Sequence, residues 1–155
     1  MTKDDGEPRI NALVAEFAVS DLPRSLRFYC GLLGFGILYD RPEEAFAFLA
    51  LGDAQLMLYQ IGAGRTLAVD GAALEPPLGR GMNLQIQVAA IEPLVTALAG
   101  AGFHPALPPE RRWYRAGTHE IGVHQFAVAD PDGYFLRFGE TVGRRPVDPS
   151  PRPGT

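Results

Sequence analysis

Residues 13–36 read LVAEFAVSDLPRSLRFYCGLLGFG, and residues 82–105 read MNLQIQVAAIEPLVTALAGAGFHP. Each stretch begins with alternating polar and apolar residues, which predict a strand, and continues with a pattern that favours a helix. Each then reaches a Gly-Phe pair, where the glycine predicts the end of the helix. The two stretches align with a single deletion, so the sequence contains an internal repeat.

Local features of the first stretch support the same elements. Alternate apolar residues of 13–19 share one face of the predicted strand. Either Ser20 or Asp21 can cap the following helix, and Pro23 lies near its first turn, where the missing N–H costs nothing. Gly34 provides the helix stop.

Three segments with strand character follow each predicted helix. They span roughly 36–40, 44–51 and 54–61 in the first half, and roughly 111–117, 121–129 and 134–140 in the second. Gly52-Asp53 and Asp132-Gly133 are the turn residues expected between the last two strands of each half. The order is βαβββ twice, in units of about 12–61 and 82–140, which predicts a single domain with an α+β fold.

The remaining segments predict connections and tails. Residues 62–81 are rich in Gly and Pro without a sustained period, which predicts a linker. Residues 1–9 are polar and residues 143–155 are proline-rich, so irregular, flexible ends are expected on both sides.

The composition indicates one soluble globular domain. The chain has 155 residues, of which 46% are apolar, and Cys30 is its only cysteine, so an internal disulfide is excluded. No apolar stretch is long enough for a membrane helix, and the start of the chain does not resemble a signal peptide. The net charge of -4 disfavours nucleic acid as a partner. We therefore expect a cytoplasmic protein.

Two motifs carry a resemblance to a known family. They read VSDLPRSLRFYCGLLGF (19–35) and FAVADPDGYFLRF (126–138). Together with the tandem βαβββ order, they resemble the vicinal oxygen chelate superfamily, which includes glyoxalase I, extradiol dioxygenases, fosfomycin-resistance enzymes and bleomycin-resistance proteins. The resemblance implies a cupped mixed sheet in which two units enclose a ligand cleft. It leaves function open, because the same fold serves catalysts and binding proteins.

The resemblance also identifies four positions where metal-using members hold their cation. In this sequence they are Val14, Met57, Asn83 and Arg137. None suits a hard divalent cation, because valine has no donor atom, a thioether is soft, an amide is a weak ligand and a guanidinium repels the metal. We therefore expect no metal and no cofactor. A noncanonical site that uses His104, His119 or His124 stays open as an alternative.

Polar side chains on the predicted strands are candidates for ligand contacts. Asn83 and Gln85 share one face of their strand, which either lines the cup or meets solvent. Met57 and Tyr59 share a face of another strand. Glu16 is a candidate contact, and it could act as a base if it were buried, since burial raises the pKa of a carboxyl group.

The segment 110–122 contains the only tryptophan, Trp113, beside Tyr114 and several arginines. The acidic chain disfavours reading it as a nucleic-acid platform. Trp113 either fills core or, with Tyr114, forms a flat wall that faces the amide-lined cup.

These expectations converge on a function. Bleomycin-resistance proteins also lack the metal ligands, so within the superfamily the sequence resembles that branch most. This resemblance implies a homodimer that sequesters a glycopeptide-type or other planar antibiotic without chemical change. A divalent-metal lyase or dioxygenase with noncanonical ligands is the alternative. The expected ligand contacts are Glu16, Met57, Tyr59, Asn83, Gln85, Trp113, Tyr114 and Arg137.

Overall fold

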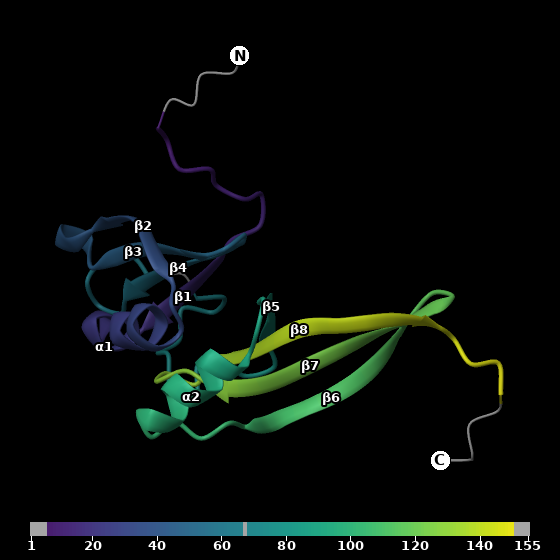
Figure 1. Ribbon diagram of the computed structural model, residues 1–155. Helices are drawn as coiled ribbons and strands as arrows, with labels where there is room; N and C mark the ends of the chain where they lie inside the picture. Colours follow the sequence, from purple (N-terminus) through teal and green to yellow (C-terminus); the bar gives the residue numbers. More distant parts are fainter. Residues whose placement is uncertain (1–5, 67, 151–155) are drawn as a thin grey trace.

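A computed structural model describes residues 6–66 and 68–150, which form two βαβββ units (Figure 1). The first unit consists of β1 (Ala15–Val19), α1 (Leu22–Leu26), its π-helical continuation η1 (Arg27–Leu32), β2 (Gly36–Arg41), the short 3-10 turn η2 (Pro42–Glu44), β3 (Phe46–Leu51) and β4 (Ala54–Gln60). The second consists of β5 (Asn83–Gln87), α2 (Glu92–Gly100), β6 (Leu107–Ala116), β7 (His119–Ala129) and β8 (Phe135–Pro146). The predicted α+β fold and its strand order are confirmed.

Each unit forms its own four-stranded mixed sheet. The strand orders are β1-β4-β3-β2 and β5-β8-β7-β6. The first strand of each unit runs parallel to the last, and the other pairs are antiparallel. The two sheets therefore repeat one topology, as the sequence repeat predicts. In both sheets the first strand of the unit lies at an edge.

The start of α1 resolves the choice between two cap residues. The Asp21 carboxylate accepts a hydrogen bond from the backbone N–H of Arg24 at 3.0 Å, so Asp21 is the N-cap. Ser20 has a different partner, because its hydroxyl bonds to Asp132 in the second unit. Gly34, with a φ of 81°, follows the helix in the left-handed region that favours glycine.

One hydrophobic core lies under the helices of both units. It contains the helix-facing residues of both sheets and apolar residues of α1, η1 and α2. The Phe28 and Phe103 rings meet 4.9 Å apart, which brings η1 next to the segment that follows α2. The fully buried large side chains of this core are Tyr29, Phe17, Phe28, Phe126, Phe138, Leu33, Leu49, Leu56, Leu58, Ile91 and Leu136.

A joint of polar and aromatic contacts connects β1 and η1 to the β7–β8 turn. The Tyr134 ring stacks on Phe17 at 4.0 Å with an interplanar angle of 3°, and its hydroxyl donates to the Ala18 carbonyl oxygen at 2.8 Å. The Tyr29 hydroxyl donates to Asp130 at 2.7 Å. These contacts link residues more than 100 positions apart. They fix the two units against each other.

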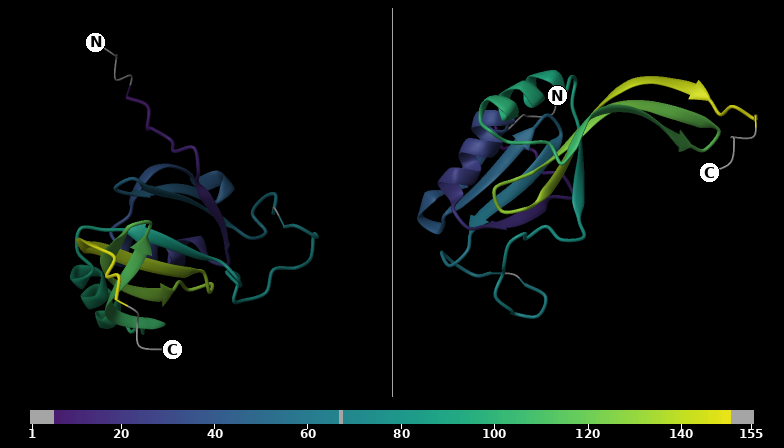
Figure 2. Two further views of the ribbon diagram at one scale, coloured as in Figure 1. Left: turned by 90° about the vertical axis from the view of Figure 1, so that its right-hand side faces the viewer. Right: turned by 90° about the horizontal axis from the view of Figure 1, so that it is seen from below.

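The last three strands are longer than the sequence predicts. The pairing of β7 with β8 continues to His119 and Pro146, so residues 143–146 are strand and the expected irregular tail begins later. In Figure 1 and in the right-hand view of Figure 2, β6, β7 and β8 extend as a curved arm beyond both helices. Residues 151–155 of the predicted tail lie outside the described residues, as do residues 1–5.

The segment before β1 is held against the first sheet. Gln55 accepts a hydrogen bond from the Asn11 backbone N–H and donates to the Arg9 carbonyl oxygen, both at 2.7 Å. Within the described ranges, no helix has the length and apolar character needed to cross a membrane.

Candidate ligand-binding faces

Each sheet has one face that carries no helix, and we call it the open face of that sheet. In the first sheet, Phe17 and Leu58 point into the core, so the residues that alternate with them belong to the open face. These are Glu16, Met57 and Tyr59, and the register pairs Glu16 directly with Met57. Three of the predicted contacts are therefore neighbours.

A cavity of about 350 Å³ lies on the first open face and is lined by Glu16 and Tyr59. Arg41 donates to Glu44 at 2.7 Å and lies 3.9 Å from the centre of the Phe46 ring, and all three residues line the same cavity. The cavity therefore combines charges of both signs with aromatic walls. Glu16 is exposed, so the burial that a catalytic base would need is not found.

The open face of the second sheet carries the other predicted polar contacts. Gln85 pairs with Arg137 in the register of β5 and β8, and the Arg137 Nη2 donates to the Gln85 Oε1 at 2.6 Å. Asn83 pairs with Phe135 at the next position on this face. The Asn83 and Gln85 amides are exposed, so within one chain this face meets solvent.

The eight predicted contacts do not form one site within the chain. Asn83 lines a second cavity of about 570 Å³ together with Arg80 and Phe135. Gln85 lines a third, of about 460 Å³, beside the exposed side chains of Leu13 and Met82. Glu16 and Tyr59 are on the first open face, as described above. The candidate contacts thus belong to more than one surface.

A hydrogen-bonded group on the second open face was missed by the sequence interpretation. Gln125 is 3% exposed, and its Nε2 donates to Glu110 at 2.9 Å and to the Tyr114 hydroxyl at 2.6 Å. Tyr114 is therefore on the open face, as predicted. The group joins β6 to β7 across a register shift between Leu107 and Glu110, which no local pattern reveals.

Trp113 lies on the opposite face from Tyr114, so the two do not form the predicted common wall. Consecutive residues of a strand point to opposite faces, and here the Trp113 ring covers Gly122 and Gly143. The Arg145 guanidinium stacks on it at 4.0 Å. A Cβ at Gly122 would come within 2.9 Å of this ring, so the glycine provides the space that it occupies.

The histidines do not assemble a metal site. His124 bonds to Glu140 at 2.7 Å, His119 to Thr118 at 2.9 Å, and His104 is exposed beyond α2. Over residues 6–66 and 68–150, no group of three histidine, cysteine or acidic side chains is placed to hold a cation. The second open face does not fit one either, because the Arg137 guanidinium would repel it.

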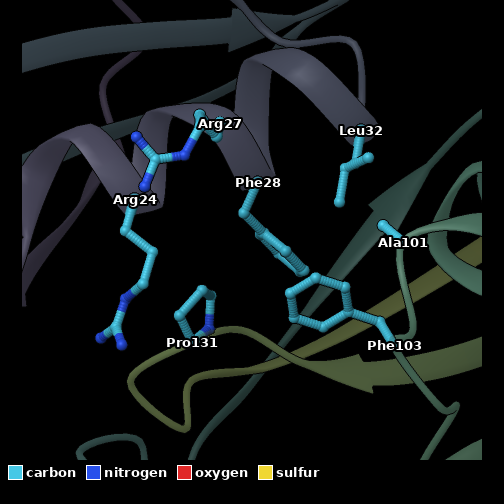
Figure 3. A pocket seen from close by; sticks show the side chains of 7 residues that line it. All are labelled: Arg24, Arg27, Phe28, Leu32, Ala101, Phe103 and Pro131. Atoms are coloured by element: carbon cyan, nitrogen blue, oxygen red, sulfur yellow. The ribbon is translucent and has the colours of Figure 1, made fainter.

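A groove of about 510 Å³ lies on the helix side of the molecule, away from both open faces. Figure 3 shows the Phe28 and Phe103 rings in contact within it and Pro131 beside the Arg24 side chain. The Arg24 guanidinium donates to Ser20 at 2.7 Å and reaches Asp132 at 3.3 Å. This arginine is therefore part of the joint between the units.

The joint contains a perturbed acid. Burial raises the pKa of Asp130, although hydrogen bonds from the Tyr29 hydroxyl and from the backbone N–H groups of Tyr134 and Asp132 oppose the rise. Burial likewise raises the pKa of Tyr134 to about 12. Because both side chains face the core, we attribute their raised pKa values to burial in the joint and not to a role in ligand binding.

Comparisons with known proteins agree with this architecture. The profile of the Glyoxalase/Bleomycin resistance protein/Dioxygenase superfamily matches residues 9–138. Bleomycin resistance proteins from Geobacillus stearothermophilus and Staphylococcus aureus are 25% identical over 130 residues, covering 80% of this chain and 92% of theirs.

Two solved structures share the fold. TioX from Micromonospora sp. ML1 has a TM-score of 0.64 at 19% identity, with 85% of this chain and 99% of that chain covered. A virulence protein from Salmonella typhimurium has a TM-score of 0.60 at 22% identity, with 87% and 100% covered.

Proposed function

Because the chain belongs to the glyoxalase/bleomycin resistance protein/dioxygenase superfamily, we propose that it is a small-molecule-binding protein that needs no metal. The observation that carries this proposal is the donor set at the four positions that the family resemblance assigns to a metal. Val14, Met57, Asn83 and Arg137 offer one soft sulfur, one amide and one permanent cation. Such a set supports recognition of an organic molecule instead of Lewis-acid chemistry.

The ligand that we propose is a planar, polar antibiotic, held in the cytoplasm without chemical change. The curated relatives are named bleomycin resistance proteins, which makes bleomycin the first compound to test. The first open face supplies the half-buried ring of Tyr59, against which a flat ring can stack. The second supplies amides at Asn83 and Gln85, which donate and accept without titrating.

A second copy of the chain would bring the two open faces together. Within one chain they are separate surfaces, and β1 and β5 each lie at a sheet edge. The apolar side chains of Leu13 and Met82, which are 89% and 48% exposed, lie beside these edges. Exposed strand edges and apolar side chains favour pairing with another chain. We therefore propose a homodimer with the ligand between two copies.

Isothermal titration calorimetry with bleomycin tests the binding function. We expect saturable binding by the metal-free protein, and at least about a tenfold loss of affinity for Tyr59→Ala, since an anchoring aromatic residue contributes roughly 2 kcal/mol or more. Glu43→Gln is the matched control, because Glu43 is exposed in η2 and outside both candidate surfaces. The absence of binding by bleomycin and by a panel of planar antibiotics would contradict the proposal. Binding that requires an added divalent cation would favour the lyase or dioxygenase reading.

Light scattering tests the assembly. We expect the mass of a dimer at micromolar concentration, and a shift toward monomer for Leu13→Glu, which places a charge on an exposed apolar side chain without disturbing the core. Wild-type protein that is monomeric at this concentration would contradict the dimer.

A further inference from the structure

Arg137 is a half-buried cation whose hydrogen-bonding capacity is only partly used. Its Nη2 donates to Gln85, but its Nε is buried and has no hydrogen-bond partner among the described residues. A guanidinium has five N–H donors in a planar fork. A buried donor without an acceptor is unfavourable, and more so on a charged group. The Gln85 amide therefore fills only part of the hydrogen-bonding capacity of this guanidinium.

No carboxylate within residues 6–66 and 68–150 compensates the charge of Arg137. Among the residues that the structure describes, no carboxylate forms an ion pair with it. Glu140 and Glu120 are engaged with His124 and Arg145 on the opposite face of the sheet. Glu110 is on the same face, but it lies two strands away and accepts from Gln125.

The immediate surroundings add further positive character. The polar neighbours on β5, Asn83 and Gln85, are neutral amides. The adjoining cavity of about 570 Å³ is lined by Asn83 and Phe135 together with Arg80, a second arginine without an ion pair among the described residues. This end of the second open face thus combines a cationic fork, amide donors and one aromatic ring.

We propose that Arg137 binds an oxyanion of the ligand, so that the protein selects small aromatic molecules with a carboxylate or phosphonate group. The oxygens of such a group match the geometry of the guanidinium fork, and the planar guanidinium is well suited to this bidentate contact. Phe135 precedes Arg137 by two residues on the same face of β8 and lines the cavity of about 570 Å³, so it offers a surface for the aromatic part. This inference rests on the proposed binding function and specifies that the ligand carries a negative charge.

Nuclear magnetic resonance titrations with three small probes test the assignment. Benzoate and phenylphosphonate carry the oxyanion, and benzamide has nearly the shape of benzoate without its charge. The Arg137 Nε–H resonance is identified by its loss in Arg137→Gln. We expect both anions to shift this resonance and to bind at least about tenfold more tightly than benzamide, because hydrogen bonds to charged groups are among the stronger ones.

Variants separate a direct contact from a general charge effect. Arg137→Gln is expected to weaken benzoate binding about 10- to 100-fold, and Arg137→Lys to recover only part of the loss, since a lysine lacks the planar fork. Arg27→Gln removes the same charge from an exposed position on the helix side and is expected to bind benzoate like the wild type.

Several results would overturn the assignment without deciding the proposed function. One is equal binding of benzamide and benzoate, and another is unchanged benzoate affinity in Arg137→Gln. A third is that Arg137→Gln dissociates the dimer in light scattering while benzoate affinity is unchanged, which would show that Arg137 pairs with the second copy. The bleomycin titration decides the binding function separately, because that assay does not depend on the charge of these probes.

Discussion

The stack of Tyr134 on Phe17 gives a quantitative prediction about the joint between the units. Tyr134 is 8% exposed and its hydroxyl donates to the carbonyl oxygen of Ala18, which is 5% exposed. Tyr134→Phe removes only this donor and leaves the carbonyl without it, so we expect a loss of about 1–3 kcal/mol in the free energy of unfolding. Tyr134→Leu removes the flat ring as well and should cost at least about 0.5–1.5 kcal/mol more.

The measurement is urea unfolding, followed by circular dichroism and by the fluorescence of Trp113. All variants are compared at one protein concentration, because association would make the midpoint depend on concentration. A double-mutant cycle with Phe17→Leu isolates the ring-to-ring contact, for which we expect a coupling of roughly 0.5–1.5 kcal/mol. Equal losses for Tyr134→Phe and Tyr134→Leu, or a coupling near zero, would refute the view that the stacked rings hold the units together.

Three further predictions concern other residues. Because the folded Asp130 carboxyl holds its proton more tightly than the unfolded one, the free energy of unfolding should fall as the pH rises from the ordinary aspartate pKa of about 3.9 through the raised value. Denaturation of the wild type and of Asp130→Asn at several pH values should show that the variant lacks this fall. Parallel plots of unfolding free energy against pH for the two proteins would contradict the prediction. Trp113→Ala should lower the free energy of unfolding by about 1–3 kcal/mol. It should leave bleomycin affinity within twofold, since the Trp113 ring faces away from Tyr114. A loss of affinity at constant stability would show instead that Trp113 contacts the ligand. Elemental analysis after dialysis without chelator should find far less than one transition metal per chain, and a stoichiometric metal would contradict the donor-set argument.

The elements predicted from the sequence are those with strong local determinants. Alternation, the Asp21 cap and the Gly34 stop define β1 and the helix, and the turn at Asp132 and Gly133 defines the last hairpin. Each of these features acts within a few residues, so it can be read without knowledge of the fold.

The arm was underestimated because its residues resemble loop residues. Pro108 and Pro109 precede the expected start of β6, but β6 is an edge strand, where proline is tolerated. Gly143 resembles the start of a tail, yet it lies against the Trp113 ring within β8. In both cases the reason for the residue is a tertiary contact that the local pattern does not contain.

The candidate site was predicted less completely than the fold. The open-face positions of Glu16, Met57 and Tyr59 follow from alternation alone. The separation of Trp113 from Tyr114 also follows from alternation and could have been predicted. The hydrogen bonds of Gln125 and the unused donors of Arg137 depend on the register between strands, so only the structure reveals them.

The joint has a consequence for how the chain could be divided. Residues 77–79 pack tightly against the β7–β8 turn, where a Cβ at Gly133 would overlap Pro77, and so they belong to the second unit. A cut near residue 72 would leave each fragment with its own sheet, helix and half of the joint. In the intact chain, the peptide connection is a tether that raises the effective concentration of one unit near the other to about the millimolar range. Two separately expressed fragments should therefore reassociate, with an affinity that measures the joint together with the apolar core that the two units share.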